Sequence, residues 1–429
     1  MSQSEPQDVV NSKGSVVQNA DEAASIVLNQ ALSAAAQGTF AVGGAIVENA
    51  TGRVIHKLHN NVLKKLLRTD SDTNNVFTYD PTAHGETQLV YWYYENKTKF
   101  NLPEPEELTI ITTLDPCVMC TGALLTAGFN VGVIAIDDYA GINWDEDFNF
   151  QTLPESLRDL AKSKFGYYAS ENKDGGPSEY VRSYKGSPNV ALRNTSISVQ
   201  RLMGCDSIFR AGLESVRADS YDAGPDADKN LLDPYYLPEE SLIKVKYREI
   251  YPDAFKVKIS NPRLPGEELF QILKKVKESE PKAQNSVALL DQFGNVILCL
   301  ADTDESPVHT AFMNVTQNYA IIRFELTKMY VNDPKKVEAP NKYLTYPKYG
   351  TFVFLYAPSP NSTKAIMTLG AYGSTLEGKV PKIFPANFQY YYPPHEGTIK
   401  ELRSVIMHLP PFYNEFAPIS IMQVAGDFT

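Results

Sequence analysis

The sequence has few cysteines and no long hydrophobic run. Four cysteines in 429 residues are too few for a disulfide scaffold and indicate a reducing compartment. No stretch approaches the roughly 20 consecutive apolar residues of a membrane-spanning helix, and the polar residues 1–20 lack the apolar core of a secretory signal. We therefore expect a cytoplasmic protein, with the nucleus as the alternative, and no membrane partner.

Positive charge is also scarce. Lys and Arg number 40 against 51 Asp and Glu, and the formal net charge at pH 7 is −11. Nucleic-acid binding usually needs a concentrated basic surface, whereas the basic clusters here are confined to residues 64–68 and 274–277. A small-molecule partner is thus favoured over RNA, which stays as an alternative.

The apolar content of 43% is ordinary for a globular protein with a core. Residues 1–20 are polar without a period, which predicts a disordered lead-in. Residues 21–165 form the first expected domain, a mixed α/β layered unit. Its expected elements are a helix from Ala20, strands Val42–Val47 and Arg53–Lys57, a helix from His84, strand Leu108–Thr113, helix Cys117–Ala127 and strand Val131–Ile136.

The first domain carries a motif with chemical content. His84-Gly85-Glu86 is followed by Pro116-Cys117-Val118-Met119-Cys120, which is the H-x-E…P-C-x-x-C pattern of zinc deaminases. Cys117 and Cys120 are three residues apart and project from one side of a helix's first turn, where the helix N-terminus favours thiolates. With His84 they form a predicted Zn2+ site of three ligands, whose open fourth position is typical of a catalytic zinc.

Glu86 lies two residues from His84 and can reach a water molecule without binding the metal. Such a site lowers the pKa of water, and the resulting hydroxide attacks the ring carbon that carries an amine. Glu86 is then the predicted catalytic residue, which carries protons from water to the ring nitrogen and to the departing ammonia. The alternative is a structural zinc knuckle, but that needs a fourth ligand, and no further cysteine or histidine lies at ligand spacing.

Residues 166–240 are rich in Gly, Pro and polar residues and are expected to be a connector with one helix, about Ser196–Arg217. The C-terminal part, residues 241–429, then appears as a repeat of the first domain. Pro358 matches Pro116 (358 − 116 = 242), and Gly294 matches Gly52 at the same offset (294 − 52 = 242). One offset that recovers two separate elements indicates a duplicated domain, and helix Gly266–Lys277 and strand pair Val287–Leu298 are expected in the second copy.

The second copy lacks the motif. His309 is matched with His84, Ala311 with Glu86, and two serines with the cysteines: Ser359 and Ser362. Neutral hydroxyls are poor zinc ligands beside thiolates, so this copy is expected to bind no zinc and to catalyse nothing. We expect it to pack against the active copy, and the alternative is that its vacant pocket binds an effector.

At His84–Glu86 and Thr112–Ala123 the sequence resembles the cytidine deaminase superfamily, with its fungal-type cytosine deaminases and its tRNA adenosine and guanine deaminases. The resemblance covers about residues 22–150, and residues 265–425 as a degenerate copy. It implies a three-layer α/β/α fold, duplicated here as an internal pseudo-dimer, and further oligomerisation.

The resemblance also implies a hydrolytic deaminase that acts on the exocyclic amine of a nucleobase, nucleoside or nucleotide, with a cytosine-type ring favoured. Asn60 sits where that group carries a ring-binding asparagine, and Gly85 is the second implied substrate-binding residue. Two alternatives remain: a tRNA adenosine deaminase or its subunit, and a non-catalytic scaffold that contains zinc.

Overall fold

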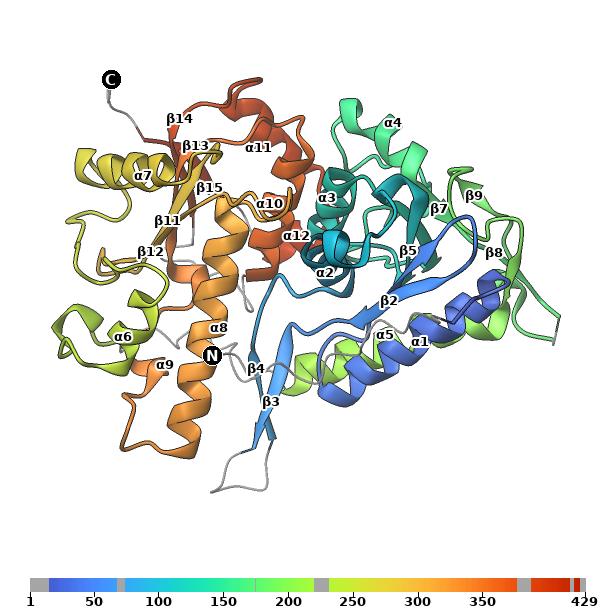
Figure 1. Ribbon diagram of the computed structural model, residues 1–429, viewed down its shortest axis with the longest axis horizontal. Helices are drawn as coiled ribbons and strands as arrows, with labels where there is room; N and C mark the ends of the chain where they lie inside the picture. Colours follow the sequence, from blue (N-terminus) through green and yellow to red (C-terminus); the bar gives the residue numbers. More distant parts are fainter. Residues whose placement is uncertain are drawn as a thin grey trace.

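The computed structural model describes residues 15–67, 74–173, 175–219, 231–375, 387–416 and 420–424. It is a mixed α/β molecule with two main sheets (Figure 1). Of the expected disordered lead-in, residues 1–14 lie outside the described residues, but residues 15–20 are ordered. Val17 is buried and its N–H donates to Gly52 O at 2.9 Å, and Ser15 O accepts from Val54 N at 2.9 Å. These two backbone bonds hold the segment on the domain. Among the described helices, none combines the length and apolar character needed to cross a membrane.

The first sheet has the strand order β2-β1-β5-β6-β7-β9. Its strands are Gly43–Glu48 (β1), Val54–His59 (β2), Leu108–Leu114 (β5), Asn130–Ala135 (β6), Phe165–Tyr167 (β7) and Lys185–Gly186 (β9). The β5/β6 and β6/β7 pairs are parallel, and the other pairs are antiparallel.

Helices cover both faces of this sheet, which makes three layers. Helices α1 (Ala20–Gln37) and α5 (Val199–Asp219) pack on one face, and α2 (Gly85–Phe100) and α3 (Val118–Ala127) on the other. The alternation of strand side chains explains this: Ile111 belongs to the core under α1, and Ile110 to the core under α2 and α3. The expected helices and strands of the first domain are confirmed to within a few residues.

Part of the expected connector belongs to the first sheet. Strand β7 pairs with β6, and β9 pairs with β7. Helix α5, where one helix was expected, lies beside α1 (Figure 1). The sequence did not indicate β7 and β9 because strands of three and two residues are too short to show a period.

The second sheet has the order β12-β11-β13-β14-β15 and repeats the directions of the first five strands of the first sheet. Its strands are Ser286–Leu290 (β11), Val296–Ala301 (β12), Thr351–Tyr356 (β13), Asn387–Tyr392 (β14) and Ser420–Gln423 (β15). Figure 1 shows helix α7 (Glu267–Ser279) on one side of it and helices α8 (Ala311–Asn332) and α10 (Thr363–Thr375) on the other. The expected helix and strand pair are confirmed, and Gly52 and Gly294 occupy matching turns with φ of 71° and 87°.

The remaining elements connect and flank the two sheets. They are the hairpin Leu63–Leu67 (β3) and Asn74–Thr78 (β4), the pair Ala169–Glu171 (β8) and Ser196–Ser198 (β10), and helices Glu155–Lys164 (α4), Leu242–Arg248 (α6), Pro340–Tyr343 (α9), Ile399–Met407 (α11) and Pro411–Phe416 (α12). The β3–β4 hairpin reaches toward α8 (Figure 1). After it, the Tyr79 ring meets Phe324 of α8 edge-on, at 5.2 Å between centroids.

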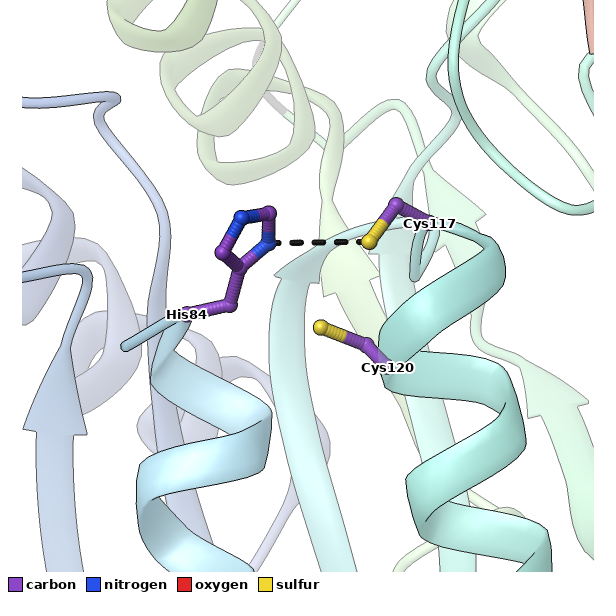
Figure 2. A group of neighbouring side chains, drawn as sticks. All are labelled: His84, Cys117 and Cys120. Atoms are coloured by element: carbon purple, nitrogen blue, oxygen red, sulfur yellow. Dashed lines mark hydrogen bonds between the residues drawn. The ribbon is translucent and has the colours of Figure 1, made fainter. Parts of the chain in front are cut away.

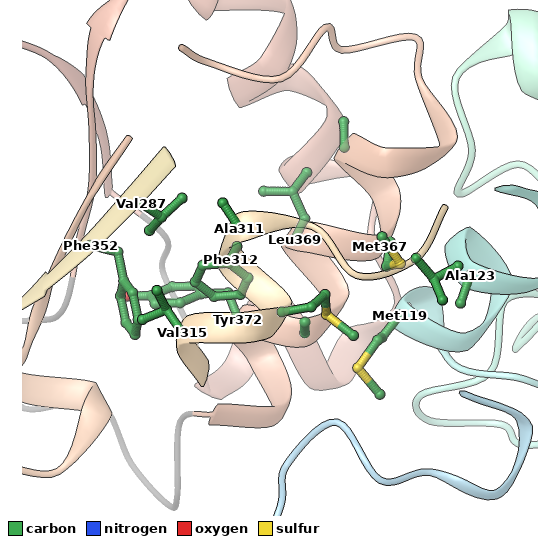
Figure 3. Packing of buried hydrophobic residues seen from close by; sticks show 14 of the residues in the cluster. Met119, Ala123, Val287, Ala311, Phe312, Val315, Phe352, Met367, Leu369 and Tyr372 are labelled. Atoms are coloured by element: carbon green, nitrogen blue, oxygen red, sulfur yellow. The ribbon is translucent and has the colours of Figure 1, made fainter. Parts of the chain in front are cut away.

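Helices α3 and α10 pack against each other at the centre of the molecule (Figure 3). A Cβ at Gly122 would lie 2.3 Å from Met367 N, and a Cβ at Gly370 would lie 2.1 Å from Met119 N. Both glycines are therefore required for this close approach. The two contacts are reciprocal, since 367 − 119 and 370 − 122 both equal 248.

This contact corrects the residue match between the two halves. At the offset of 248, the positions of the two motif cysteines are taken by Ala365 and Thr368 rather than by Ser359 and Ser362. The strands still match at 242, so six more residues (248 − 242 = 6) separate β13 from the contact in α10 than separate β5 from the contact in α3. Three of them lie in a longer loop, residues 357–362 against 115–117, and three in an earlier start of the helix. Pro116 and Pro358 each lie two residues after the end of their strand, so the match at the prolines holds and the two halves differ only after it.

A similar correction applies at the start of α8. Its N-cap is Thr310, and the N-cap of α2 is His84. When the two helix starts are aligned, Thr310 rather than His309 is level with His84, and Phe312 rather than Ala311 is level with Glu86.

Candidate active site

His84, Cys117 and Cys120 come together as expected. One ligand atom from each lies within 4.8 Å of the other two, and Cys117 Sγ is 3.5 Å from His84 Nδ1. Figure 2 shows the imidazole at the start of α2 facing both sulfur atoms at the start of α3. Within the described part of the chain, no other three His, Cys, Asp or Glu residues form such a group.

Two helix starts position these side chains. His84 is the N-cap of α2 and Cys117 the N-cap of α3, both with extended backbone. Asn60 lies just after β2, and its Oδ1 accepts a hydrogen bond of 2.5 Å from Gly85 N. This bond satisfies one of the free N–H groups at the start of α2 and ties that start to the edge of the sheet.

The donor set fits zinc. Two thiolates and an imidazole are ligands that Zn2+ prefers, and in a tetrahedral site such atoms lie roughly 3.5–4 Å apart. Burial lowers the pKa of His84, but the neighbouring Cys117 thiolate outweighs it, and the pKa is raised overall. A hydrogen bond from Cys120 holds the pKa of Cys117 well below its usual range, which favours the thiolate.

Glu86 lies next to this group without joining it. Its side chain is 3% exposed, Thr112 Oγ1 donates to Oε1 at 2.8 Å, and Oε2 lies 3.5 Å from Cys120 Sγ. Burial, and then the negative charge of Cys117, raise the pKa of the Glu86 carboxyl. A raised pKa makes the carboxyl a better proton acceptor, as proton transfer at this site would require.

The sequence analysis missed Thr112 and Thr87 as parts of the site. Thr87 Oγ1 lies 3.5 Å from Cys120 Sγ, and both threonines are fully buried. No distinct signal in the sequence marks Thr112, because the strand that leads into the cysteine motif also contains Thr109 and Thr113.

Asn60 is buried at the site, as its predicted role requires. However, its carbonyl oxygen already accepts the Gly85 N–H, so the amide nitrogen is the group that could donate to a ligand. Gly85 N is likewise engaged by that bond and acts in positioning rather than as a free donor.

The second half of the chain supports the His84 side of the site. Gln317 of α8 donates to Asp80 Oδ2 at 2.9 Å, and Asp80 Oδ1 accepts from both the N–H and the hydroxyl of Thr82 at 2.8 Å. His84 N in turn donates to Thr82 O at 2.9 Å. The backbone of the metal-binding histidine is therefore fixed by a chain of hydrogen bonds that begins in the other half.

The second half also reaches Cys117. Tyr413 of α12 is 1% exposed, and its hydroxyl lies close enough to Cys117 for the two groups to influence each other's charge. Burial, and then the charges of Cys117 and Cys120, raise the pKa of this tyrosine. The segment is held in place by Phe412 N, which donates to Tyr139 O at 3.2 Å.

Residues 17–136 match the family model of the cytidine and deoxycytidylate deaminase zinc-binding region. This match contains the three metal-binding residues and Glu86, so that part of the chain is similar to the zinc-binding region of the cytidine and deoxycytidylate deaminases. Together with the geometry of the histidine and the two cysteines, the match identifies the site as one for Zn2+. No curated protein matches the chain.

Two similar solved structures are a tRNA:A34 deaminase that performs A-to-I editing at the wobble position of transfer RNA and the guanine deaminase from Nitrosomonas europaea. The first is 25% identical, with 28% of this chain and 80% of that chain covered and a TM-score of 0.22. The second is 16% identical, with 47% of this chain and 89% of that chain covered and a TM-score of 0.29. At these scores the two likenesses identify no substrate for this chain.

Proposed function

We propose that the chain is a zinc-dependent hydrolytic deaminase that replaces the exocyclic amine of a nucleobase, nucleoside or nucleotide with a carbonyl oxygen and releases ammonia. A cytosine-type ring is the favoured substrate. The observation that carries the proposal is the position of Glu86. This buried carboxylate lies beside three metal-binding side chains and is not itself one of the metal-binding group. A purely structural zinc site would not need it.

The residues of the site have distinct roles in this reaction. Zinc, when bound by His84, Cys117 and Cys120, supplies a Lewis acid that lowers the pKa of water. Glu86 would take a proton from the attacking water and give it to the ring nitrogen. It would then take the proton of the newly added hydroxyl and pass it to the amine, which leaves as ammonia as the carbonyl forms. Thr112 fixes one carboxylate oxygen, so that the other faces the sulfur side of the site.

The second half is, in this proposal, a non-catalytic copy of the first. Its sheet has the same strand order, and α3 and α10 meet through reciprocal contacts. Phe312 replaces the proton carrier, and Ala365 and Thr368 replace the thiolates. Through Gln317 and Tyr413 it serves as a built-in partner that supports the zinc site, in an internal pseudo-dimer.

The test is ammonia release from a panel of free bases, nucleosides, nucleotides and a tRNA transcript. Each substrate is measured with the zinc-loaded wild type and with Glu86→Ala as its blank. We expect release from a cytosine compound by the wild type and blank-level release by the variant. Turnover of the tRNA transcript alone would replace the proposal with RNA editing. No ammonia release from any substrate, by a protein that holds one zinc per chain, would favour a non-catalytic scaffold.

A further inference from the structure

A cavity of about 600 Å³ lies in the second half of the chain. It opens at the end of β13 and the starts of α8 and α10, which is where the first half holds its zinc site. Its volume falls in the range of about 300–1,000 Å³ that is typical of small-molecule sites. The residues that line it include Thr310, Ala311 and Phe312 from the start of α8.

The cavity contains a hydrogen bond that corresponds to the bond between Asn60 and Gly85 at the zinc site. Asp302 Oδ1 accepts from Ala311 N at 2.8 Å, as Asn60 Oδ1 accepts from Gly85 N. The two acceptor residues are related by the strand offset, since 302 − 60 = 242. Asp302 Oδ2 accepts two further backbone N–H groups, from residues 284–285, at 3.0 and 2.8 Å. Because both oxygens are satisfied by the backbone, this carboxylate holds the wall together and is not free to bind a cation.

The lining offers cationic groups for an anion. Lys277 comes from the last turn of α7 and Lys364 from the first turn of α10, and both are half-buried. Neither takes part in an ion pair in the described part of the chain. The N-terminus of α10, a helix of 13 residues, adds a partial positive charge beside Lys364.

The same cavity has aromatic walls. Phe312, Phe354 and Tyr356 line it. The Phe312 and Phe354 rings stack with centroids 5.7 Å apart and an angle of 16°, and Tyr356 stacks on His395 at 5.2 Å. Figure 3 shows Phe312 packed among the aromatic rings of the second core, which makes this wall rigid. Flat aromatic surfaces suit a planar heterocycle.

We propose that this cavity binds a nucleoside monophosphate. The phosphate is held by Lys277, Lys364 and the start of α10, and the base lies against the aromatic wall. The site binds without turnover, because Phe312 stands where Glu86 stands in the first half. This inference concerns binding alone and does not depend on deamination in the first half.

The test is calorimetric titration of the full, zinc-loaded chain with the four common ribonucleoside 5′-monophosphates. Glu86→Ala is the background, which prevents turnover. We expect saturable binding of at least one of them, weakened at least tenfold by Lys277→Ala and by Lys364→Ala. Lys274→Ala is the matched control, because Lys274 is exposed on the same helix and does not line the cavity. It should change the affinity less than twofold.

Several outcomes would overturn this inference. Absence of nucleotide binding at millimolar concentration would do so, as would binding that survives both lysine variants. Nucleotide binding that is abolished by Asn60→Ala would assign the ligand to the zinc site instead. Equal affinity for inorganic phosphate would remove the role of the aromatic wall, and binding of an RNA oligonucleotide without binding of mononucleotides would show a different class of ligand.

Discussion

Thr112 gives the Glu86 carboxylate its direction. The hydroxyl donates to Oε1 at 2.8 Å inside the core, where no water can replace it. A hydrogen bond to a charged group contributes about 1.5–3 kcal/mol, and each 1.36 kcal/mol corresponds to a tenfold change in rate.

We therefore predict that Thr112→Val lowers kcat by about ten- to a hundredfold and leaves the zinc content at one per chain. Steady-state ammonia release and metal analysis measure both. Thr126→Val is the control, because Thr126 bonds to Thr363 far from the metal, and it should keep kcat. An unchanged kcat in Thr112→Val would show that Glu86 needs no such support.

Asp291 is a buried carboxyl in the turn of the second sheet. It accepts hydrogen bonds from Phe293 N and from the backbone and side chain of Asn295. Burial nevertheless raises its pKa from 3.8 to about 6. The folded state therefore binds this proton more tightly than the unfolded state does. The resulting contribution to the free energy of unfolding is complete below pH 3.8 and is lost as the pH rises through about 6.

The stability advantage of the wild type over Asp291→Asn should thus shrink by about 3 kcal/mol between pH 3.5 and pH 7. Urea unfolding at several pH values measures it. Asp253→Asn is the control, because it removes an exposed carboxylate that is paired with Lys256. A difference between wild type and Asp291→Asn that is constant with pH would contradict the burial argument.

At the residue scale, the metal-binding group was predictable because its spacing is local. Cys117 and Cys120 share one helix turn, and His84 and Glu86 share another. Tyr413 and Gln317 were not predictable, since they reach the site only through tertiary packing of distant segments.

At the scale of elements, the contact of α3 with α10 decides how the two halves fit. It depends on Gly122 and Gly370, whose missing side chains let the backbones approach. Helix propensity alone would make alanine better than glycine by about 1 kcal/mol in a helix interior. The close packing of the two helices predicts the opposite, because alanine at these positions should be less stable than glycine.

Accordingly, Gly370→Ala should lower the free energy of unfolding by about 1–3 kcal/mol, because the new Cβ would meet the Met119 backbone. Chemical denaturation measures the change. Gly266→Ala is the control, since a Cβ there meets nothing within 4 Å, and it should stay within about 0.5 kcal/mol. A stabilised Gly370→Ala variant would mean that the two helices do not pack this closely.

Elements with a clear period were predicted well, and the errors have physical causes. The strands β7 and β9 are too short to show alternation, so the chain around them resembled a connector. The six additional residues between β13 and the contact in α10 could not be detected from one sequence, because they come after Pro358, which does match Pro116. The contacts of Met367 with Gly122 and of Met119 with Gly370 show which turns of the two helices meet.

At the scale of the whole molecule, the zinc site is supported by both halves. The hydrogen-bond chain from Gln317 through Asp80 and Thr82 to His84 crosses between them. Residues that orient a metal ligand commonly change metal affinity by ten- to a hundredfold when they are lost.

Gln317→Ala should therefore weaken zinc binding by about tenfold or more, measured by competition with a chelator. Asn318→Ala is the matched control, because the neighbouring Asn318 bonds only within α8 to Asn314 O and should keep the zinc affinity. If both variants bound zinc like the wild type, the second half would not support the site through this contact.

The central claim is that Glu86 performs proton transfer beside a zinc ion that it does not bind. The most direct measurement is ammonia release by wild type and Glu86→Ala, with both proteins at a verified content of one zinc per chain. The account predicts that the variant keeps its zinc and its thermal stability and loses at least 10²-fold of the wild-type rate. Wild-type turnover by the zinc-loaded variant would contradict it.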